Sequence, residues 1–439
     1  MNERARPGRP KRETFRTPGA MLAAMALALL LAFRCSAQEQ ADSSTSDALS
    51  LHFQQTIIIQ NHDRFPSPYS GMNSMSSNEQ PAMTLTTTLF LRTSFQDVFD
   101  AELDPEIGGG KGLSFSTGMA GFPNGEAYRV SEVAPRLEFV RAYLQKTLSV
   151  DASSRLTIVA GKFSIADYFD LNAYSNSPRN QFMNWALINN GAWDYPANTR
   201  GYTEGIVVDY RGNSFALRYA AVLEPTSANG PNLDGHISKS IGQAVEGEFN
   251  YSFLHRRGKI RTLLFYNTAR MGSYGQATND TSFHHDITLS EQYSRHKYGF
   301  GINVEQSLSD DAGAFLRIGW NDGQNETWAY TEIDRTISGG MTSKLAMIGR
   351  RADSFGLAFV LSGISDAHRE YLNSGGYGFI IGDGSLPKYG PEGIIEAFYL
   401  FQLNKMLGIS LDYQFAVNPA YNEDRGPVNI GAVRVHFEI

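Results

Sequence analysis

The chain ends in Val433-Arg434-Val435-His436-Phe437-Glu438-Ile439, where apolar side chains occupy every odd position and polar or charged side chains every even position. Successive side chains of a strand point to opposite faces, so this pattern predicts a strand with one apolar and one polar face. The same alternation recurs over 407–417 and 298–305. Repeated along a chain of 439 residues, it predicts a membrane β-barrel with lipid outside and a polar lumen inside.

The alternation also assigns side chains to the two faces of the barrel wall. A charge on the lipid face is costly, whereas a charge in a water-filled lumen is tolerated. The residues predicted to face lipid are Ile302, Leu411, Tyr413, Val433 and Val435, and those predicted to face the lumen are Glu305, Asp412 and Arg434.

The composition fits the same class of protein. The chain contains 42 glycines, 21 tyrosines and 27 phenylalanines, as expected for many turns and for aromatic residues at the membrane interfaces. The mean hydropathy is nevertheless slightly polar, at −0.30, and beyond residue 37 no apolar run is long enough for a transmembrane helix. A barrel explains both observations, because only every second strand residue must face lipid. The net charge of −7 argues against nucleic acid as a partner.

The first 37 residues have the features of a secretory signal peptide. A basic stretch precedes the apolar run Met21 to Phe33, and Cys35-Ser36-Ala37 offers a small-residue cleavage site. Cleavage there would remove the only cysteine, so neither disulfides nor cysteine-bound metals are expected. Residues 38–50 are polar and are predicted to form a short lead-in, followed by a barrel domain over 51–439.

Strand patterns follow one another through most of the barrel domain, usually in pairs joined by short turns. At roughly 25 residues per strand and connection, the length predicts about sixteen strands, an even number as in other bacterial barrels. Longer stretches rich in glycine and asparagine are predicted to be exterior loops, namely 108–128, 224–240, 271–296 and 321–340. The predicted strands are 85–95, 136–150, 155–165, 206–210, 215–223, 245–254, 260–268, 298–308, 315–320, 355–361, 394–403, 407–417 and 428–439.

Between Ser164 and Tyr202 the alternation stops, and the sequence becomes rich in aromatic, amide and charged residues. So many large rings would be costly in water, so they are expected to pack against something. The barrel interior is the natural place for them. The sequence therefore predicts that this segment folds inward and constricts the pore.

Several motifs resemble the carbohydrate-selective porin family (OprB-like), and they extend over nearly the whole chain after residue 37. The block 164–202 carries the most specific of them. The matching motifs are Ser67–Gly71, Gly121–Gly125, Gly161–Phe163, Asp167–Asp170, Asn184–Leu187, Asn190–Pro196, Thr199–Tyr202, Asn418-Pro419 and Val433–Ile439. The resemblance implies passive diffusion of monosaccharides and related sugars across the bacterial outer membrane, through a monomer or homotrimer.

The residues of the block suit a sugar channel independently of that resemblance. A sugar presents hydroxyls at its edge and C–H groups on its faces, so amides, carboxylates and guanidinium groups can bind the edge and aromatic rings the faces. The expected partners are therefore carbohydrates and outer-membrane lipids, with no cofactor or metal. The residues predicted for the constriction or for sugar contact are Arg179, Asn184, Trp185, Asn190, Trp193, Asp194, Arg200, Glu305, Arg317 and Glu396.

Structural roles for the same residues stay open at this point. Trp185 and Trp193 could wedge the segment against the wall, and Asp194 could form an ion pair with Arg200. The strand residues Glu305, Arg317, Glu396 and Asp412 could belong to a solvated lumen wall. A closed barrel that acts as an adhesin or receptor, or a barrel enzyme, is the alternative function. No catalytic constellation is visible, and His284-His285-Asp286 is better explained as a polar loop than as a metal site.

Overall fold

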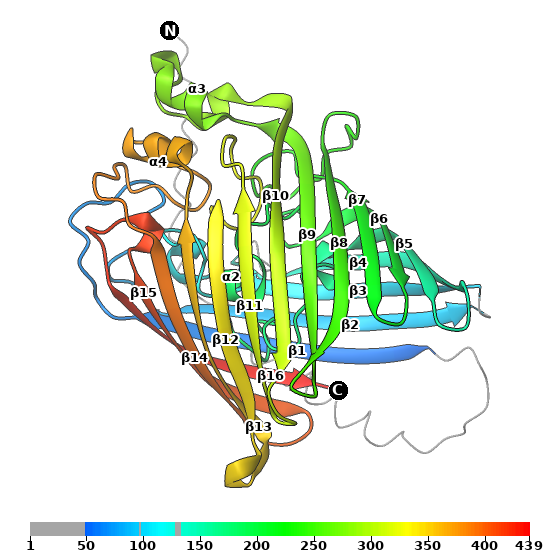
Figure 1. Ribbon diagram of the computed structural model, residues 1–439. Coiled ribbons are helices and arrows are strands. Elements are labelled where there is room, and N and C mark those ends of the chain that lie inside the picture. Colours follow the sequence, from blue (N-terminus) through cyan, green and yellow to red (C-terminus); the bar gives the residue numbers. More distant parts are fainter. Residues whose placement is uncertain (1–48, 96–97, 128–132) are drawn as a thin grey trace. The chain divides into compact units, whose positions relative to one another are not determined.

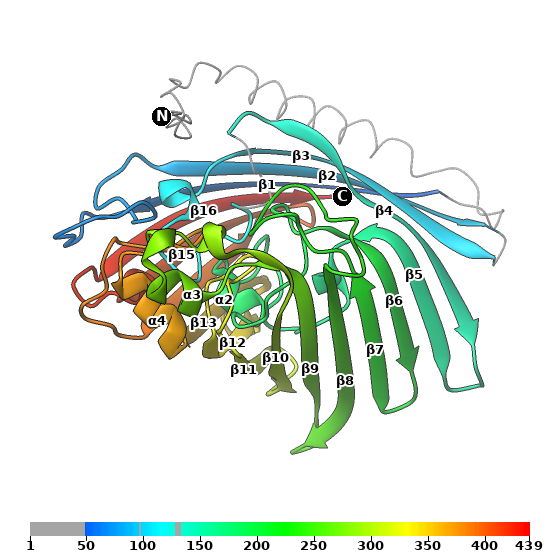
Figure 2. The same ribbon diagram turned by 90° about the horizontal axis from the view of Figure 1, so that it is seen from above.

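The computed structural model describes residues 49–95, 98–127 and 133–439. The predicted signal peptide (1–37) and all but the last two residues of the predicted lead-in (38–50) lie outside these ranges. Within the described part, sixteen antiparallel strands form one closed sheet, in which each strand pairs with its neighbours in the chain and β1 pairs with β16 (Figures 1 and 2). The predicted fold class and strand number are confirmed.

The strands follow one another without any crossover. The pairing of β1 with β16 sets Ile57 opposite Val435, and the pairing of β15 with β16 sets Leu411 opposite Val433. The strands are β1 (Ser50–His62), β2 (Ala82–Phe95), β3 (Phe99–Gly110), β4 (Arg136–Ser149), β5 (Arg155–Phe163), β6 (Thr203–Arg211), β7 (Phe215–Val222), β8 (Ile241–Phe253), β9 (Arg256–Met271), β10 (Gln292–Ser307), β11 (Ala312–Asn321), β12 (Arg335–Leu345), β13 (Arg350–Gly363), β14 (Glu392–Gln402), β15 (Leu407–Val417) and β16 (Val428–Glu438).

The two faces of the wall agree with the prediction from alternation. Leu411 is 62% exposed on the outside, whereas its neighbour Asp412 is 5% exposed on the inside. Tyr413 and Val433 are likewise exposed, Ile302 and Val435 are half-buried, and Glu305 and Arg434 are buried. Apolar side chains therefore cover the outer surface, and the polar positions of the strands point inward.

The connections differ between the two ends of the barrel. Short turns join β2 to β3, β4 to β5 and the following pairs at one end, where β1 also starts and β16 ends. Long loops join the alternate pairs at the other end. The helices and 3₁₀ turns lie in these loops, except η5: η1 (Leu113–Ser116), η2 (Ile165–Asp167), α2 (Trp185–Ile188), α3 (Tyr274–Asn279), η3 (Thr281–Phe283), η4 (Ile287–Ser290), η5 (Ala346–Ile348), α4 (Asp366–Asn373) and η6 (Pro419–Tyr421).

Three strands were not predicted from the sequence. β1 and β3 were not recognised as strands at all, and β12 was assigned in part to the loop 321–340. β3 contains Pro105, where its register with β4 shifts, and β12 contains the pair Gly339-Gly340. Proline and glycine are depleted in strands, so both segments read as loops. Each nevertheless pairs on both sides with the strands that precede and follow it in the chain.

Candidate functional site

The segment 164–202, which connects β5 to β6, lies inside the barrel. Most of its side chains are buried, and α2 lies within the ring of strands in both views (Figures 1 and 2). Asn184 begins α2, because its side chain accepts a hydrogen bond from the Ala186 N–H at 3.0 Å. The predicted inward folding is confirmed, and we call these residues the inward segment.

The wall opposite β5 and β6 binds the backbone of the inward segment. The Glu396 carboxylate, on β14, accepts hydrogen bonds from the N–H of Met183 and, at 2.9 Å, from the N–H of Asn184. The Asn184 side chain donates at 3.2 Å to Gln414 on β15. Glu396 is fully buried. The sequence left open that Glu396 belongs to a solvated wall; the structure shows instead that it holds the segment.

Arg317 and Glu305 fix another part of the same segment. The Arg317 guanidinium, on β11, forms an ion pair with Asp170 at 3.1 Å and donates to the carbonyls of Leu187 at 2.7 Å and Ser175 at 2.8 Å. Glu305, on β10, accepts from the Ala173 N–H at 2.8 Å. These wall charges are therefore anchors of the inward segment as well as lumen residues.

The Asn190 side chain lies so close to the wall that the two wall residues beneath it, Gly301 and Gly319, must be glycine. A Cβ at Gly319 would lie 2.0 Å from Asn190 Oδ1, and a Cβ at Gly301 would lie 2.2 Å from its Nδ2. The Asn190 N–H donates at 2.7 Å to Asp170. Two inward-facing glycines on neighbouring strands thus form the seat of this side chain.

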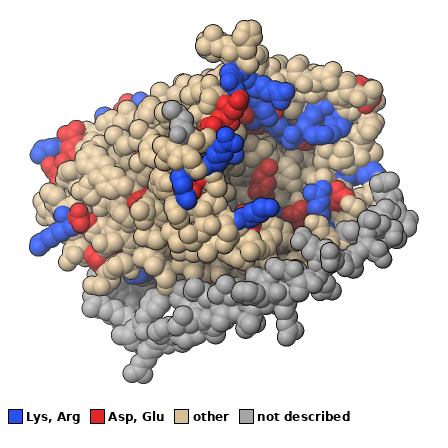
Figure 3. Space-filling view, turned by 90° about the horizontal axis from the view of Figure 1, so that it is seen from below, with Lys and Arg blue, Asp and Glu red and all other residues tan. Residues whose placement is uncertain are grey.

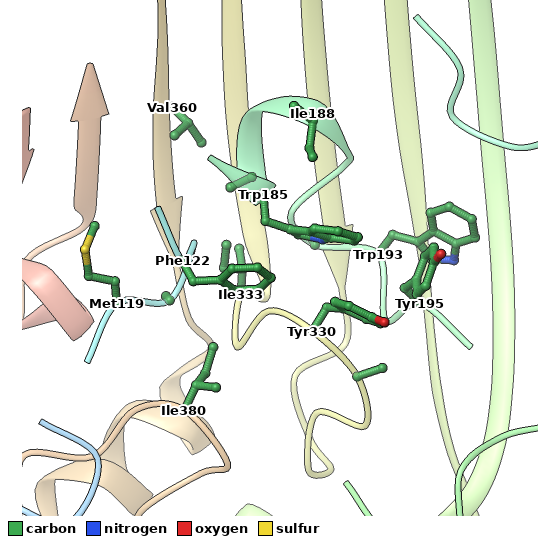
Figure 4. Close-up of a cluster of buried hydrophobic side chains, with 14 of the residues drawn as sticks. Met119, Phe122, Trp185, Ile188, Trp193, Tyr195, Tyr330, Ile333, Val360 and Ile380 are labelled. Carbon is green, nitrogen blue, oxygen red and sulfur yellow. The ribbon is translucent and has the colours of Figure 1, made fainter. Parts of the chain in front are cut away.

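The aromatic rings of the inward segment form a buried cluster (Figure 4). Trp185 stacks on Tyr330 with centroids 4.5 Å apart, lies nearly parallel to Phe122 and meets Tyr195 edge on. Trp193 packs on Tyr195 and Phe169. Only 3% of Trp185 and 2% of Trp193 is exposed, so neither ring offers an open face to a solute. This geometry favours the wedging role over direct sugar contact.

Two loops predicted to be exterior contribute to this cluster. Phe122 comes from the β3–β4 loop and Tyr330 from the β11–β12 loop, and both residues are buried. The Glu392 carboxylate, on β14, accepts from the N–H groups of Ala120 and Gly121 at 2.9 Å each. Both loops join strands at the long-loop end, as predicted, but the parts around Phe122 and Tyr330 are buried against the inward segment.

Arg179 and Arg200 bind carboxylates on the β3–β4 side of the lumen. Arg179 lies 3.3 Å and Arg200 lies 3.2 Å from the same carboxylate, that of Glu106 on β3. Arg179 also contacts Glu126 at 3.1 Å, and Arg200 contacts Glu138 at 3.1 Å. The ion pair of Arg200 with Asp194 that the sequence suggested is not formed, because these carboxylates take the guanidinium.

Asp194 binds a different part of the chain. One of its oxygens accepts from the N–H groups of Trp328 and Ala329, at 3.0 and 2.9 Å, and so ties the inward segment to the β11–β12 loop. Burial raises the pKa of Asp194 to about 6, although nearby Lys297 and these two N–H groups favour its charged form. Asp194 is thus a structural contact of the loops.

Further charged groups continue around the lumen, and apart from Glu305 none of them was predicted to be a site residue. Arg141, on β4, binds Asp167 at 2.7 Å and Asp104 at 3.2 Å. On the wall of β7 to β10, Arg218 pairs with Glu246 and Glu248, and Arg261 pairs with Glu248 and Glu305. All of these strand residues occupy inward positions, so alternation within β3, β4 and β7 to β9 was the signal that could have identified them.

The outer ends of some of these ion pairs remain open to solvent. The side chains of Glu138 and Asp167 are 26% and 33% exposed, and that of Lys259, which lies 3.3 Å from Glu248, is 39% exposed. A solute in the lumen therefore meets paired charges of both signs. Hydroxyl groups can both donate to such carboxylates and accept from such cations.

A recess of about 460 Å³ lies under the inward segment, toward the short-turn end. Tyr174, Asn180 and Gln181 of the segment line it, together with inward residues of β10 to β16 and the adjoining turns. Figure 3 views the molecule from below and shows its surface hollowed, with acidic and basic side chains around the hollow. We call this cavity the short-turn recess.

Two kinds of feature are absent from the described residues. In the part of the chain that the structure covers, no helix combines the length and apolar character needed to cross a membrane. Over the same residues, no three or more His, Cys, Asp or Glu side chains are grouped so that they could hold a metal ion.

Comparison with known proteins places the chain in a family. The model of the family described as carbohydrate-selective porin, OprB family, matches residues 68–439. Among solved structures, the high-pH structure of Pseudomonas putida OprB matches with a TM-score of 0.68 at 14% identity, over 90% of this chain and 94% of that one. The outer membrane channel DcaP of Acinetobacter baumannii matches with a TM-score of 0.52 at 9% identity, over 91% and 99%.

These two structures show the likeness of fold, and the family model, which covers most of the chain, shows the family. No curated protein sequence matches the chain. The match also covers the inward segment and every strand from β2 to β16. The chain therefore belongs to the OprB family of carbohydrate-selective porins.

Proposed function

We propose that this protein is an outer-membrane pore for the passive diffusion of small carbohydrates, and that the inward segment sets its width and selectivity. The observation that carries the proposal is a segment of 39 residues bound inside a closed barrel by buried contacts to several strands. A segment held in this way takes up lumen volume that a plain barrel would leave to water.

The paired charges explain why the solutes would be neutral and polar. Arg141 and its partner Asp167, which are both partly exposed, offer donors and acceptors side by side, which suits a ring of hydroxyl groups. A cation or an anion in the lumen is repelled by the member of each pair that has its own sign, and this offsets the attraction of the other member. The pore would therefore admit sugars by hydrogen bonding and not by net charge.

Different residues would have different parts in selectivity. Glu138 and Asp167, whose side chains are partly exposed, would contact the sugar. Arg179 and Arg200, which are buried, would shape the path by holding Glu106 and Glu138 in place. Trp185 and Trp193 would keep the segment in place from within the cluster. Asn184, Asn190, Asp194, Glu305, Arg317 and Glu396 would act in the same way, as anchors. The constriction thus depends on all of these residues, but only Glu138 and Asp167 among them face the solute.

Liposome swelling with sugars of graded size tests the proposal. Wild-type protein should admit monosaccharides faster than disaccharides. Arg200→Ala and Trp185→Ala should reduce this difference, because the first removes the cation that pairs with Glu106 and Glu138 and the second loosens the segment. Trp320→Ala is the matched control, since Trp320 lies on the outer face of β11 and should leave the size dependence unchanged. If liposomes that contain the protein swell no faster than protein-free liposomes, the pore function is disproved.

Export and assembly belong to the same proposal. Residues 1–37 would direct the chain to the membrane and then be removed, and the barrel would act as a monomer or homotrimer. Single-channel conductance separates this pore from a closed barrel that serves as a receptor or an enzyme, because a closed barrel would show no steady conductance.

A further inference from the structure

The short-turn recess contains an aromatic ring that the contacts described so far do not use. Tyr174 belongs to the inward segment, is half-buried and lines the recess. A Cβ at Gly313, on β11, would lie 1.9 Å from Tyr174 Cζ, so the ring rests on a glycine that leaves room for it. The wall thus holds this tyrosine at one place in the cavity.

The position of Tyr174 is fixed from its backbone as well. Its N–H donates at 2.9 Å to Asn172 Oδ1, and the preceding Ala173 N–H donates at 2.8 Å to Glu305. Asn172 in turn donates to Asn303 at 2.7 Å. A ring held by the neighbouring backbone and by a glycine seat is preorganised, which lowers the entropy cost of binding a ligand against it.

The groups around the ring are polar and of both signs. Asn180 is exposed in the recess, and Lys344 and Lys405 lie in its lining with Asp310, Asp311 and Glu438. Amide and charged side chains at the edge of an aromatic ring are the donors and acceptors that suit hydroxyl groups. Because acids and bases both line the cavity, a neutral ligand suits it better than an anion.

The size of the recess suits a small sugar. Small-molecule sites commonly enclose roughly 300–1,000 Å³ and combine apolar or aromatic surface with a few polar groups. The short-turn recess, at about 460 Å³, lies within this range. It is also distinct from the paired charges of the β3–β4 side, because its walls come from β10 to β16.

We infer that the short-turn recess is a binding site for a neutral mono- or disaccharide, with one sugar ring packed on Tyr174 and its hydroxyls bound by Asn180 and the neighbouring polar side chains. This inference rests on the proposed pore function and adds a sugar-binding site at the short-turn end. The site is on one side of the inward segment, so the pore is asymmetric toward its solute. A sugar that enters from the short-turn end reaches the site before the constriction.

Single-channel recording with maltose on one side at a time tests the inference. In wild-type channels, maltose on one side should cause longer current interruptions than maltose on the other. Tyr174→Ala should shorten the long interruptions about tenfold, because the stacking surface is lost, and Tyr174→Phe should keep most of their length. Phe355→Ala, on the outer face of β13, is the control and should behave like wild type.

Asn180→Ala gives an independent test if Tyr174→Ala does not fold. Asn180 is exposed, so its replacement should not prevent folding and should shorten the interruptions. Interruptions of equal length in wild type and in both variants, with normal conductance, would overturn the site while leaving the pore intact. Loss of sugar permeation from wild-type liposomes would instead overturn the pore function itself.

Discussion

At the scale of single residues, Arg317 connects separate points of the inward segment, namely Asp170, Ser175 and Leu187. Arg317→Ala should leave the buried Asp170 carboxylate without its cation, at a cost of about 3–5 kcal/mol. The segment should loosen, and single channels should become noisier and more conductive. Arg317→Lys keeps the charge but not the fork of donors, so it should restore the behaviour only in part. If Arg317→Ala channels show the same current noise and the same conductance as wild type, Arg317 does not anchor the inward segment.

Asp194 should make the stability of the loops depend on pH. Its pKa is raised by burial from the usual 3.8 to about 6 in the folded protein. A carboxyl with a raised folded pKa favours the folded state below about pH 4, and this contribution is lost as the pH rises to about 6. Asp194→Asn should remove this part of the pH dependence of the unfolding midpoint, measured on electrophoresis of heated samples. Asp311→Asn, in an exposed turn, should leave the pH dependence of the unfolding midpoint unchanged. If the midpoint depends on pH in the same way in wild type and in Asp194→Asn, the raised pKa does not belong to Asp194.

At the scale of elements, the two-faced strands make a prediction about membrane insertion. Leu411, on the outer face of β15, should tolerate Val but not Arg, because a charge near the bilayer midplane costs roughly 2–4 kcal/mol. Leu411→Arg should lower the yield of heat-modifiable barrel. Asp412→Asn, one residue further and inside, should affect the yield less. Equal yields for Leu411→Arg and Leu411→Val would show that this position does not meet lipid.

The same periodicity explains how far the strands could be predicted. β15 and β16 carry a regular alternation, so the sequence was enough to identify them and to assign Leu411 and Arg434 to opposite faces. β3 has Pro105 and a row of acids, and β12 has Gly339-Gly340, so local preference argued against both. Their pairing is with the strands next to them in the chain, β2 and β4 for β3 and β11 and β13 for β12, and no pattern within either strand reports it.

In the loops, the sequence predicted only part of the buried contacts. The density of aromatic residues revealed the inward segment, but Phe122 and Tyr330 stand in stretches that resemble ordinary exterior loops. Their burial depends on the presence of Trp185, which lies far from both in the chain. A single sequence can thus identify one side of such a packing contact and miss the other.

At the scale of the whole molecule, many charged side chains of the lumen form ion pairs that offset one another. Exposed charges are screened over about 10 Å at 0.1 M salt, whereas buried pairs are screened much less. The permeation rate of a neutral sugar should therefore stay nearly constant between low and high salt, and only the weak preference among ions should change. Liposome swelling at several salt concentrations, kept at equal osmolarity, measures this. A several-fold change in sugar flux would indicate that unpaired charges control entry.

The sequence could not predict which wall residue contacts which residue of the inward segment. Glu396 and Arg317 could be assigned to the inner face, and Met183 and Asp170 to the inward segment, but nothing in the sequence matched one with the other. Each match depends on the radius of the barrel and on the height at which the segment crosses it. For the same reason Arg200 was paired in prediction with nearby Asp194, and in the structure with Glu106.

The inward segment also constrains the order in which the protein can fold. Its contacts join residues separated by 147 positions for Arg317 and Asp170, by 212 for Asn184 and Glu396, and by 256 for Arg434 and Pro178. The last of these partners lies on β16, so it becomes available only after nearly all of the chain has been synthesised. Such distant pairings form slowly, and the segment's rings and carboxylates remain without partners until then. The unfolded chain therefore leaves the rings of this segment exposed for as long as its lipid-facing strands.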